Sequence, residues 1–118
     1  MADYRKLRVW KKAYALAINA ARVAKGIRDP DHKPLRSQLN RAAMSIATNI
    51  VEGRAKKSDR DFARFLSYSL GSATELEHHV MIGRDVGVIT IADSTSLLDQ
   101  TVEVRKMLQG LIGRLLGE

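Results

Sequence analysis

The sequence predicts an all-α protein: an antiparallel up-and-down four-helix bundle that forms one domain over residues 1–118 and assembles as a homo-oligomer. A chain of 118 residues has the length of a single domain. Apolar residues recur at three-and-four spacing in four long segments, as in amphipathic helices. The two prolines, Pro30 and Pro34, flank one breaker segment, and no segment alternates convincingly with the period of a strand. Four such helices with short connections pack most economically as a bundle.

The first two helices are predicted on either side of the breaker segment 29–34. The apolar stripe expected to form the core side of the first helix comprises Leu7, Trp10, Tyr14, Ala17, Ala21 and Ala24. The second helix is expected to stop at Gly53, because glycine is common at the end of a helix. Its expected core stripe comprises Leu35, Leu39, Ala42, Ala43, Ile46 and Ile50.

The last two helices each begin with a predicted capping box. Ser58 followed by Asp61 starts the third helix, which is expected to run out at Gly87, and Thr90 followed by Asp93 starts the fourth. The expected core residues of the third helix are Phe62, Phe65, Leu66, Ser69, Ala73, Leu76 and Val80. Those of the fourth helix are Leu97, Thr101, Val104, Leu108, Leu111 and Leu115.

The second helix has an apolar arc too wide for a lone bundle. Between Ser37 and Val51 the only charged residue is Arg41, whereas an exposed helix face normally carries several charges. Burial against another subunit explains this better, so we expect a homo-oligomer. At 100° per residue, the residues that extend the arc beyond the core, and hence the expected oligomer interface, are Asn40, Met44, Ala47 and Val51.

A polar stripe runs beside the core residues of the same helix. On the second helix it comprises Gln38, Arg41, Ser45, Asn49 and Glu52. A hairpin that turns near Lys56 would set Arg41 near Ser72 and Glu75 of the third helix, and Glu52 opposite Arg60. We interpret the stripe as hydrogen bonds and ion pairs that fix helix register, and consider an active site the less favoured alternative.

The charge distribution favours an anionic partner. Residues 1–64 carry a net charge of about +10 and residues 65–118 about −3, and no acidic residue lies between Tyr4 and Arg28. Lys and Arg contacts to phosphates would bind nucleic acid without reading its sequence. The alternatives are a solvated helix face and a surface that docks an acidic protein. The candidate phosphate-binding residues form a face on the first helix (Arg8, Lys11, Lys12, Arg22 and Lys25) and a cluster at the next turn (Arg54, Lys56, Lys57 and Arg60).

Catalytic and metal-dependent chemistry is not expected. The Glu75-x-x-His78 spacing resembles one half of a di-iron site, but no second such motif exists, so we expect no metal and interpret His78 and His79 as surface or helix-boundary residues. The chain has no cysteine, no nucleophile elbow and no glycine-rich phosphate loop. We therefore expect a non-enzymatic protein without a cofactor.

We expect the protein to reside in the cytoplasm and to have no membrane partner. No apolar run reaches the roughly 18 to 20 residues that a membrane span needs, and the basic N-terminal segment leads into a charged helix.

Three segments of the chain carry a resemblance to a known family: QLNRAAMSIATNIVEG (residues 38–53), GSATELE (residues 71–77) and LRVWKKA (residues 7–13), and Phe65-Leu66 also fits. With these segments the chain resembles the bacterial four-helix-bundle proteins encoded in intervening sequences of 23S ribosomal RNA genes, also described as S23 ribosomal protein-like. Val51 and Ser69 depart from alanines common in that family. The residues that match its signature positions are Arg41, Ser45, Asn49, Glu52, Gly53, Gly71, Ser72 and Glu75.

The resemblance implies an up-and-down bundle that assembles into homopentamers. Related accessory proteins of diversity-generating retroelements bind nucleic acid and a reverse transcriptase through a basic surface. The sequence and this resemblance together predict an oligomeric accessory or scaffold protein that binds RNA or DNA, with a reverse transcriptase as one candidate protein partner. The alternative is an adaptor that docks an acidic protein without binding nucleic acid.

Overall fold

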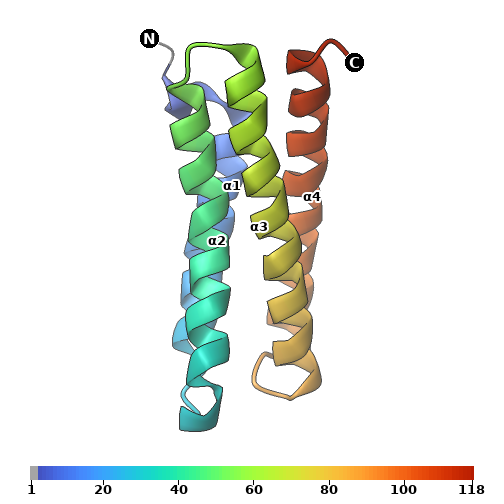
Figure 1. Ribbon diagram of the computed structural model, residues 1–118. Coiled ribbons are helices and arrows are strands. Elements are labelled where there is room, and N and C mark those ends of the chain that lie inside the picture. Colours follow the sequence, from blue (N-terminus) through green and yellow to red (C-terminus); the bar gives the residue numbers. More distant parts are fainter. Residues whose placement is uncertain (1–2) are drawn as a thin grey trace.

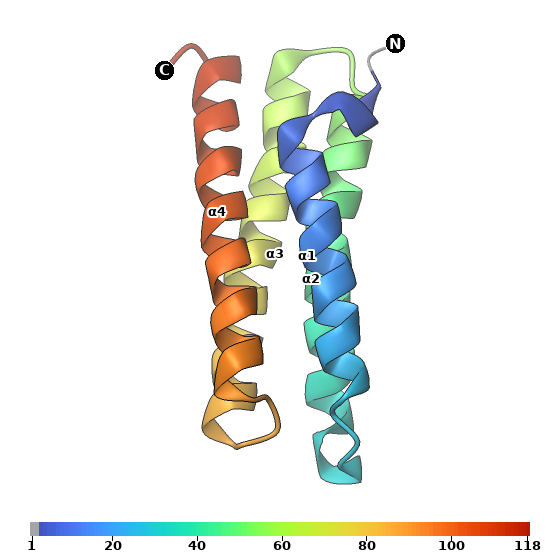
Figure 2. The same ribbon diagram turned by 180° about the vertical axis from the view of Figure 1, so that it is seen from behind.

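Four helices run up and down in chain order, and each packs against its two neighbours (Figure 1). The structure is a computed structural model that describes residues 3–118. Seen from behind, α1 lies beside α4 and closes the bundle (Figure 2). No strand occurs in the described part of the chain, so the predicted all-helical class is confirmed. The helices span Arg8–Lys25 (α1), Lys33–Arg54 (α2), Asp59–Asp85 (α3) and Ile91–Leu115 (α4).

Two short 3-10 helices lead into the first half of the bundle: η1 (Tyr4–Lys6) precedes α1, and η2 (Pro30–His32) precedes α2. A carboxylate oxygen of Asp29 accepts a hydrogen bond of 2.9 Å from the backbone N–H of Asp31. That bond, together with the nearby His32 ring, holds the pKa of Asp29 below its ordinary value. The breaker segment is therefore an ordered turn.

The predicted helix starts of α3 and α4 are confirmed. The Ser58 hydroxyl accepts a hydrogen bond of 3.1 Å from the backbone N–H of Asp61, and the Thr90 hydroxyl accepts one of 3.0 Å from that of Asp93. After α3 ends, Gly87 adopts a φ of +82°, a left-handed conformation that glycine reaches without steric cost. Capping thus fixes both ends of the α3–α4 connection.

The core forms where the predicted stripes of α2, α3 and α4 meet. Most of their predicted core residues are buried, and Leu35, Phe65, Leu111 and Leu115 are partly buried. Ser69 and Thr101 are also fully buried, and each donates its hydroxyl to a backbone carbonyl. Within residues 3–118, no helix is long and apolar enough to cross a membrane.

The predicted core stripe of α1 was wrong in large part: Ala24 is buried and Leu7 and Trp10 are partly buried against the core, but the stripe as a whole does not face it. Tyr14 and Ala21 are exposed, and Trp10 and Ala17 are only partly buried. Trp10 also packs between Tyr4 and Tyr14, with ring centroids 5.2 and 5.0 Å away. Both stripes satisfy helical spacing, and the one that faces the other three helices fills the core. The residues of α1 buried there are Val9, Ala13, Leu16, Ala20, Val23 and Ala24.

Gly53 does not stop α2, because the helix continues through it to Arg54. Instead, Gly53 is buried where α3 packs closely against α2. A Cβ placed on it would lie 2.8 Å from the Cβ of Phe65 and 3.0 Å from Cδ1 of Phe62. The first distance is shorter than two carbon atoms tolerate and the second is tight, so the absence of a side chain on Gly53 leaves room for Phe62 and Phe65 beside the turn.

Candidate nucleic-acid interface

The α2–α3 turn gathers four of the predicted phosphate-binding residues at the end of the bundle that also holds both chain termini (Figure 1). Lys56, Lys57 and Arg60 are exposed, and Arg54 is partly buried. None of these four cations forms an ion pair with another described residue. Their charge is therefore available to an external anion.

Aromatic rings underlie two of these cations. The guanidinium of Arg54 lies 5.6 Å from the ring centroid of Phe62, and the ammonium of Lys56 lies 4.8 Å from that of Phe65. Such cation–π contacts hold long side chains in place without neutralising them. The Nε of Arg54 is buried and lacks a hydrogen-bond partner among residues 3–118. An anion at the other nitrogens of this guanidinium would offset its lost hydration.

The five basic residues predicted on the first helix are all exposed and lie outside the observed core stripe of α1. Two of them are paired with acidic residues of α4. Lys12 lies 3.2 Å from a carboxylate oxygen of Glu103, and Arg22 lies 2.9 Å from one of Asp93. Arg8, Lys11 and Lys25 have no such partner in the described chain, so the positive face is strongest at the start of α1.

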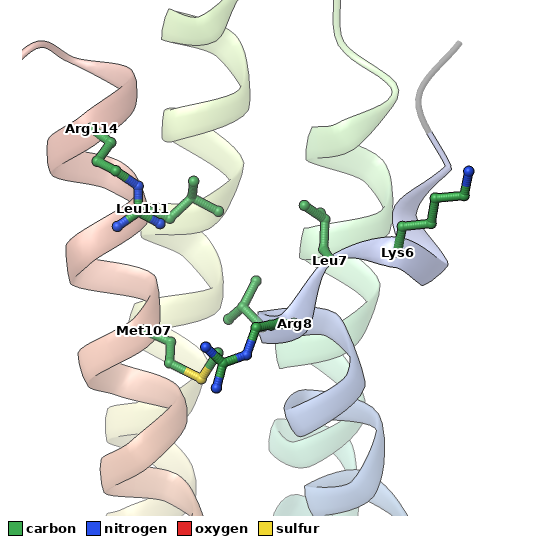
Figure 3. A pocket seen from close by; sticks show the side chains of 7 residues that line it. Lys6, Leu7, Arg8, Met107, Leu111 and Arg114 are labelled. Carbon is green, nitrogen blue, oxygen red and sulfur yellow. The ribbon is translucent and has the colours of Figure 1, made fainter.

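A cleft of about 370 Å³ lies between the first turn of α1 and the last turns of α4. Its apolar surface comes from Leu7, Val9, Met107 and Leu111. Arg8 approaches from α1, while Met107 and Arg114 approach from α4 (Figure 3). Lys6 and Arg114, which line the cleft, were not among the predicted binding residues. We call the cations at this end of the molecule the basic end: Lys6, Arg8, Arg54, Lys56, Lys57, Arg60 and Arg114.

The polar stripe forms only in part. Ser45 and Ser72 share a hydrogen bond of 2.8 Å across α2 and α3, and Asn49 donates one of 3.1 Å to the Ser45 hydroxyl. These bonds support the interpretation that this part of the stripe fixes helix register.

The predicted ion pairs of the stripe are not found. Arg41 and Glu52 are exposed, and neither pairs with Glu75, Arg60 or any other described residue. Glu75 instead lies 3.3 Å from Nε2 of His79 on its own helix. The short serine side chains occupy the seam between α2 and α3, so the longer charged groups extend into solvent.

The predicted oligomer-interface residues lie on an exposed apolar surface that α1 enlarges. Met44 is 59% exposed, and Asn40, Ala47 and Val51 are partly buried. Beside them on α1, Tyr14 and Ile18 are 52% and 58% exposed. A hollow of about 390 Å³ runs along this surface. We call it the α1–α2 face; its members are Tyr14, Ala17, Ile18, Ala21, Asn40, Met44, Ala47, Thr48 and Val51.

The histidines do not form a cluster of ligands. His78 is exposed and His79 partly buried, and both lie well inside α3 rather than at its boundary. Across residues 3–118, no group of three or more histidine and carboxylate side chains is arranged to hold a metal ion.

Comparison with known proteins places this geometry in context. The family described as 23S rRNA-intervening sequence protein matches residues 5–110. A crystal structure of a protein of unknown function from the S23 ribosomal protein family of Bacteroides thetaiotaomicron superposes with a TM-score of 0.83. It is 25% identical in sequence, and the match covers 88% of this chain and 97% of that one. No curated protein sequence matches.

Proposed function

The chain belongs to the 23S rRNA-intervening sequence protein family, and we propose that it is a non-catalytic, oligomeric scaffold that binds RNA or DNA. The observation that carries this proposal is the basic end, where the cations of the α2–α3 turn have no acidic partners within residues 3–118. Phosphates supply the missing negative charge, and the exposed cations at the start of α1 extend the surface. Recognition of this kind is independent of nucleotide sequence.

Self-assembly strengthens such binding. The α1–α2 face exposes Tyr14, Ile18 and Met44 side by side, and an apolar surface of this kind is better covered by a second copy of the chain. The family resemblance favours a closed ring of five subunits. A ring repeats the basic end in every subunit, so several phosphate contacts act together and raise the overall affinity.

The decisive experiment measures binding of the purified oligomer to structured RNA and to duplex DNA over a salt series. We expect binding at about 50 mM salt that weakens steeply with added salt, because each phosphate contact adds about 0.7 to 0.9 to the negative slope of log affinity against log salt. Lys56→Glu with Lys57→Glu should weaken binding to all sequences alike. The matched control is Lys33→Glu with Arg36→Glu, the same charge change on exposed residues at the opposite end of α2. If the wild-type oligomer binds neither nucleic acid at about 50 mM salt, the proposal fails.

The cleft between α1 and α4 favours a second candidate function, that of an adaptor for an acidic protein. Its apolar surface with Arg8 and Arg114 at the rim suits a peptide that combines apolar and acidic side chains. A reverse transcriptase is one candidate partner, from the family resemblance. Binding to an acidic polypeptide together with no binding to nucleic acid would favour this function, and Met107→Glu should then abolish the interaction.

A further inference from the structure

The first half of α3 presents an exposed tyrosine among cations. Tyr68 is 49% exposed, while the neighbouring Phe65 is partly buried. The two rings pack edge to face with centroids 5.4 Å apart and an interplanar angle of 73°. Lys56 lies over the Phe65 ring at 4.8 Å. We call Lys56, Arg64, Phe65 and Tyr68 the aromatic cluster; it adjoins the basic end at the α2–α3 turn.

Arg64 links the two rings. Its guanidinium carbon lies 5.1 Å from the centroid of Phe65 and 6.0 Å from that of Tyr68, and its Nη1 donates a hydrogen bond of 3.2 Å to the Tyr68 hydroxyl. That bond raises the pKa of Arg64 above its ordinary value, so the group stays charged. The Tyr68 side chain is therefore held at two places: its ring packs against Phe65, and its hydroxyl accepts the hydrogen bond from Arg64.

The anchoring of the cluster is rigid. Phe65 sits where α3 meets the bare Cα of Gly53, and Phe62 beside it is buried under Arg54. A half-exposed ring held in place in this way loses little conformational entropy when a planar ligand stacks on it. Three cations, Arg54, Lys56 and Arg64, lie within 6 Å of the cluster's rings or of Phe62. Arg64 is also paired with Asp61, at 3.5 Å, while Arg54 and Lys56 have no acidic partner among the described residues, so the surroundings keep a positive charge that favours a planar ligand carrying negative charge.

We propose that Tyr68 is a stacking site for an unpaired nucleobase, with Lys56 and Arg64 contacting the phosphates on either side of it. The proposal rests on the proposed nucleic-acid function and deepens it by naming the ligand class, namely single-stranded RNA or DNA. Every base has a π-face that can stack on tyrosine. In a duplex the neighbouring base pairs cover those faces, so the site distinguishes single strands from duplexes without reading sequence.

Three nucleic-acid probes of equal length separate the contribution of base stacking to binding from that of phosphate charge. They are a single strand, the duplex of the same sequence, and an abasic strand that keeps the phosphates and lacks the bases. We expect the wild-type oligomer to bind the single strand more tightly than the abasic strand at equal salt. Tyr68→Ala should weaken single-strand binding by about 5- to 150-fold, the range that one base–aromatic stack produces, and leave abasic binding unchanged.

Two variants serve as matched controls. Tyr68→Phe keeps the ring and removes only the hydroxyl that Arg64 contacts, so it should retain single-strand binding to within about 2-fold of wild type. His78→Ala removes another exposed ring of α3, outside the aromatic cluster, and should change nothing. Circular dichroism and sedimentation establish that each variant folds and assembles; because Tyr68 is half exposed, its replacement leaves the core intact.

The outcomes distinguish this site from the general function. Equal wild-type affinity for the base-bearing and abasic strands overturns the stacking site but leaves the phosphate-binding scaffold standing. If Tyr68→Ala weakens binding to the base-bearing and the abasic strand equally, the stacking site is also overturned, because such a loss reports a change of charge or structure rather than stacking. A wild-type oligomer that binds no probe overturns both proposals.

Discussion

Ser69 of α3 donates its hydroxyl to the main-chain carbonyl of Ile46 in α2, over a distance of 2.8 Å. Both residues are fully buried, so this bond ties the two helices together inside the core. The hydroxyl is satisfied by the partner helix rather than by its own. The buried serine therefore leaves no unpaired polar group in the core.

Replacing Ser69 by alanine should lower the free energy of unfolding by about 0.5 to 1.5 kcal/mol, the net contribution of one such hydrogen bond. The loss is moderate because the Ile46 carbonyl also accepts within its helix. Urea unfolding at fixed protein concentration measures it. Ser67→Ala is the control, since Ser67 is exposed and bonds within α3; an equal effect of both changes would contradict the role of the cross-helix bond.

Gly53→Ala should destabilise the protein by about 1 to 3 kcal/mol, because the added methyl group overlaps Phe65 and forces α2 and α3 apart. Gly71→Ala is the opposite case. Gly71 lies exposed inside α3, and apart from its chain neighbours and the adjacent backbone of its own helix no atom lies within 4 Å of an added Cβ, so alanine there should stabilise by about 0.5 to 1 kcal/mol. Thermal unfolding of the two variants tests the expected loss of stability in Gly53→Ala and the expected gain in Gly71→Ala. A destabilised Gly71→Ala would contradict the packing described for α3.

Ile18→Glu and Met44→Glu should each weaken assembly, because a carboxylate on the α1–α2 face loses hydration when a second copy covers it. Sedimentation at micromolar concentration reports the change as smaller particles. Ile91→Glu places the same charge at a somewhat more exposed residue in the first turn of α4 and should leave the oligomer intact. A wild-type protein that sediments as a monomer contradicts the assembly itself.

Glu103→Gln should strengthen nucleic-acid binding, because it removes the carboxylate that lies 3.2 Å from Lys12. Lys12 then contacts phosphate, and the slope of log affinity against log salt steepens by up to about 0.9 for each subunit engaged. Asp31→Asn gives the same change in net charge at the opposite end of the bundle. Equal strengthening by the two variants would show that net charge, and not the basic face of α1, sets the affinity.

The four helices follow from the sequence because apolar spacing and capping residues are local signals. The failure in α1 has a physical cause. Its alanines and aromatic residues form a second apolar stripe about one residue around the helix from the true core, and spacing alone cannot rank two stripes. Only the position of the other three helices decides that Leu16 turns inward and Tyr14 outward.

The sequence predicted the positive charge of the candidate site but not its three-dimensional arrangement. Arg54, Lys56, Lys57 and Arg60 are adjacent in sequence, so their cluster needed no tertiary information. Tyr68 lies two turns into α3 and packs on Phe65, and the contact of Phe65 with Lys56 depends on the close approach of α2 and α3 at Gly53. The expected pairing of Arg41 with Glu75 failed for a related reason. The register of two helices predicts which backbone positions lie opposite each other, but it does not predict where the ends of long side chains lie.

The packing of Trp10 between Tyr4 and Tyr14 gives the protein its own optical reporter. Trp10 is the only tryptophan in the chain and is partly exposed next to Tyr14, a member of the α1–α2 face. Its indole emission therefore responds to water at that face. If a second copy excludes the water, as the proposed assembly requires, the emission shifts to shorter wavelength, so dilution of the unlabelled protein yields the dissociation constant of the proposed oligomer from fluorescence alone.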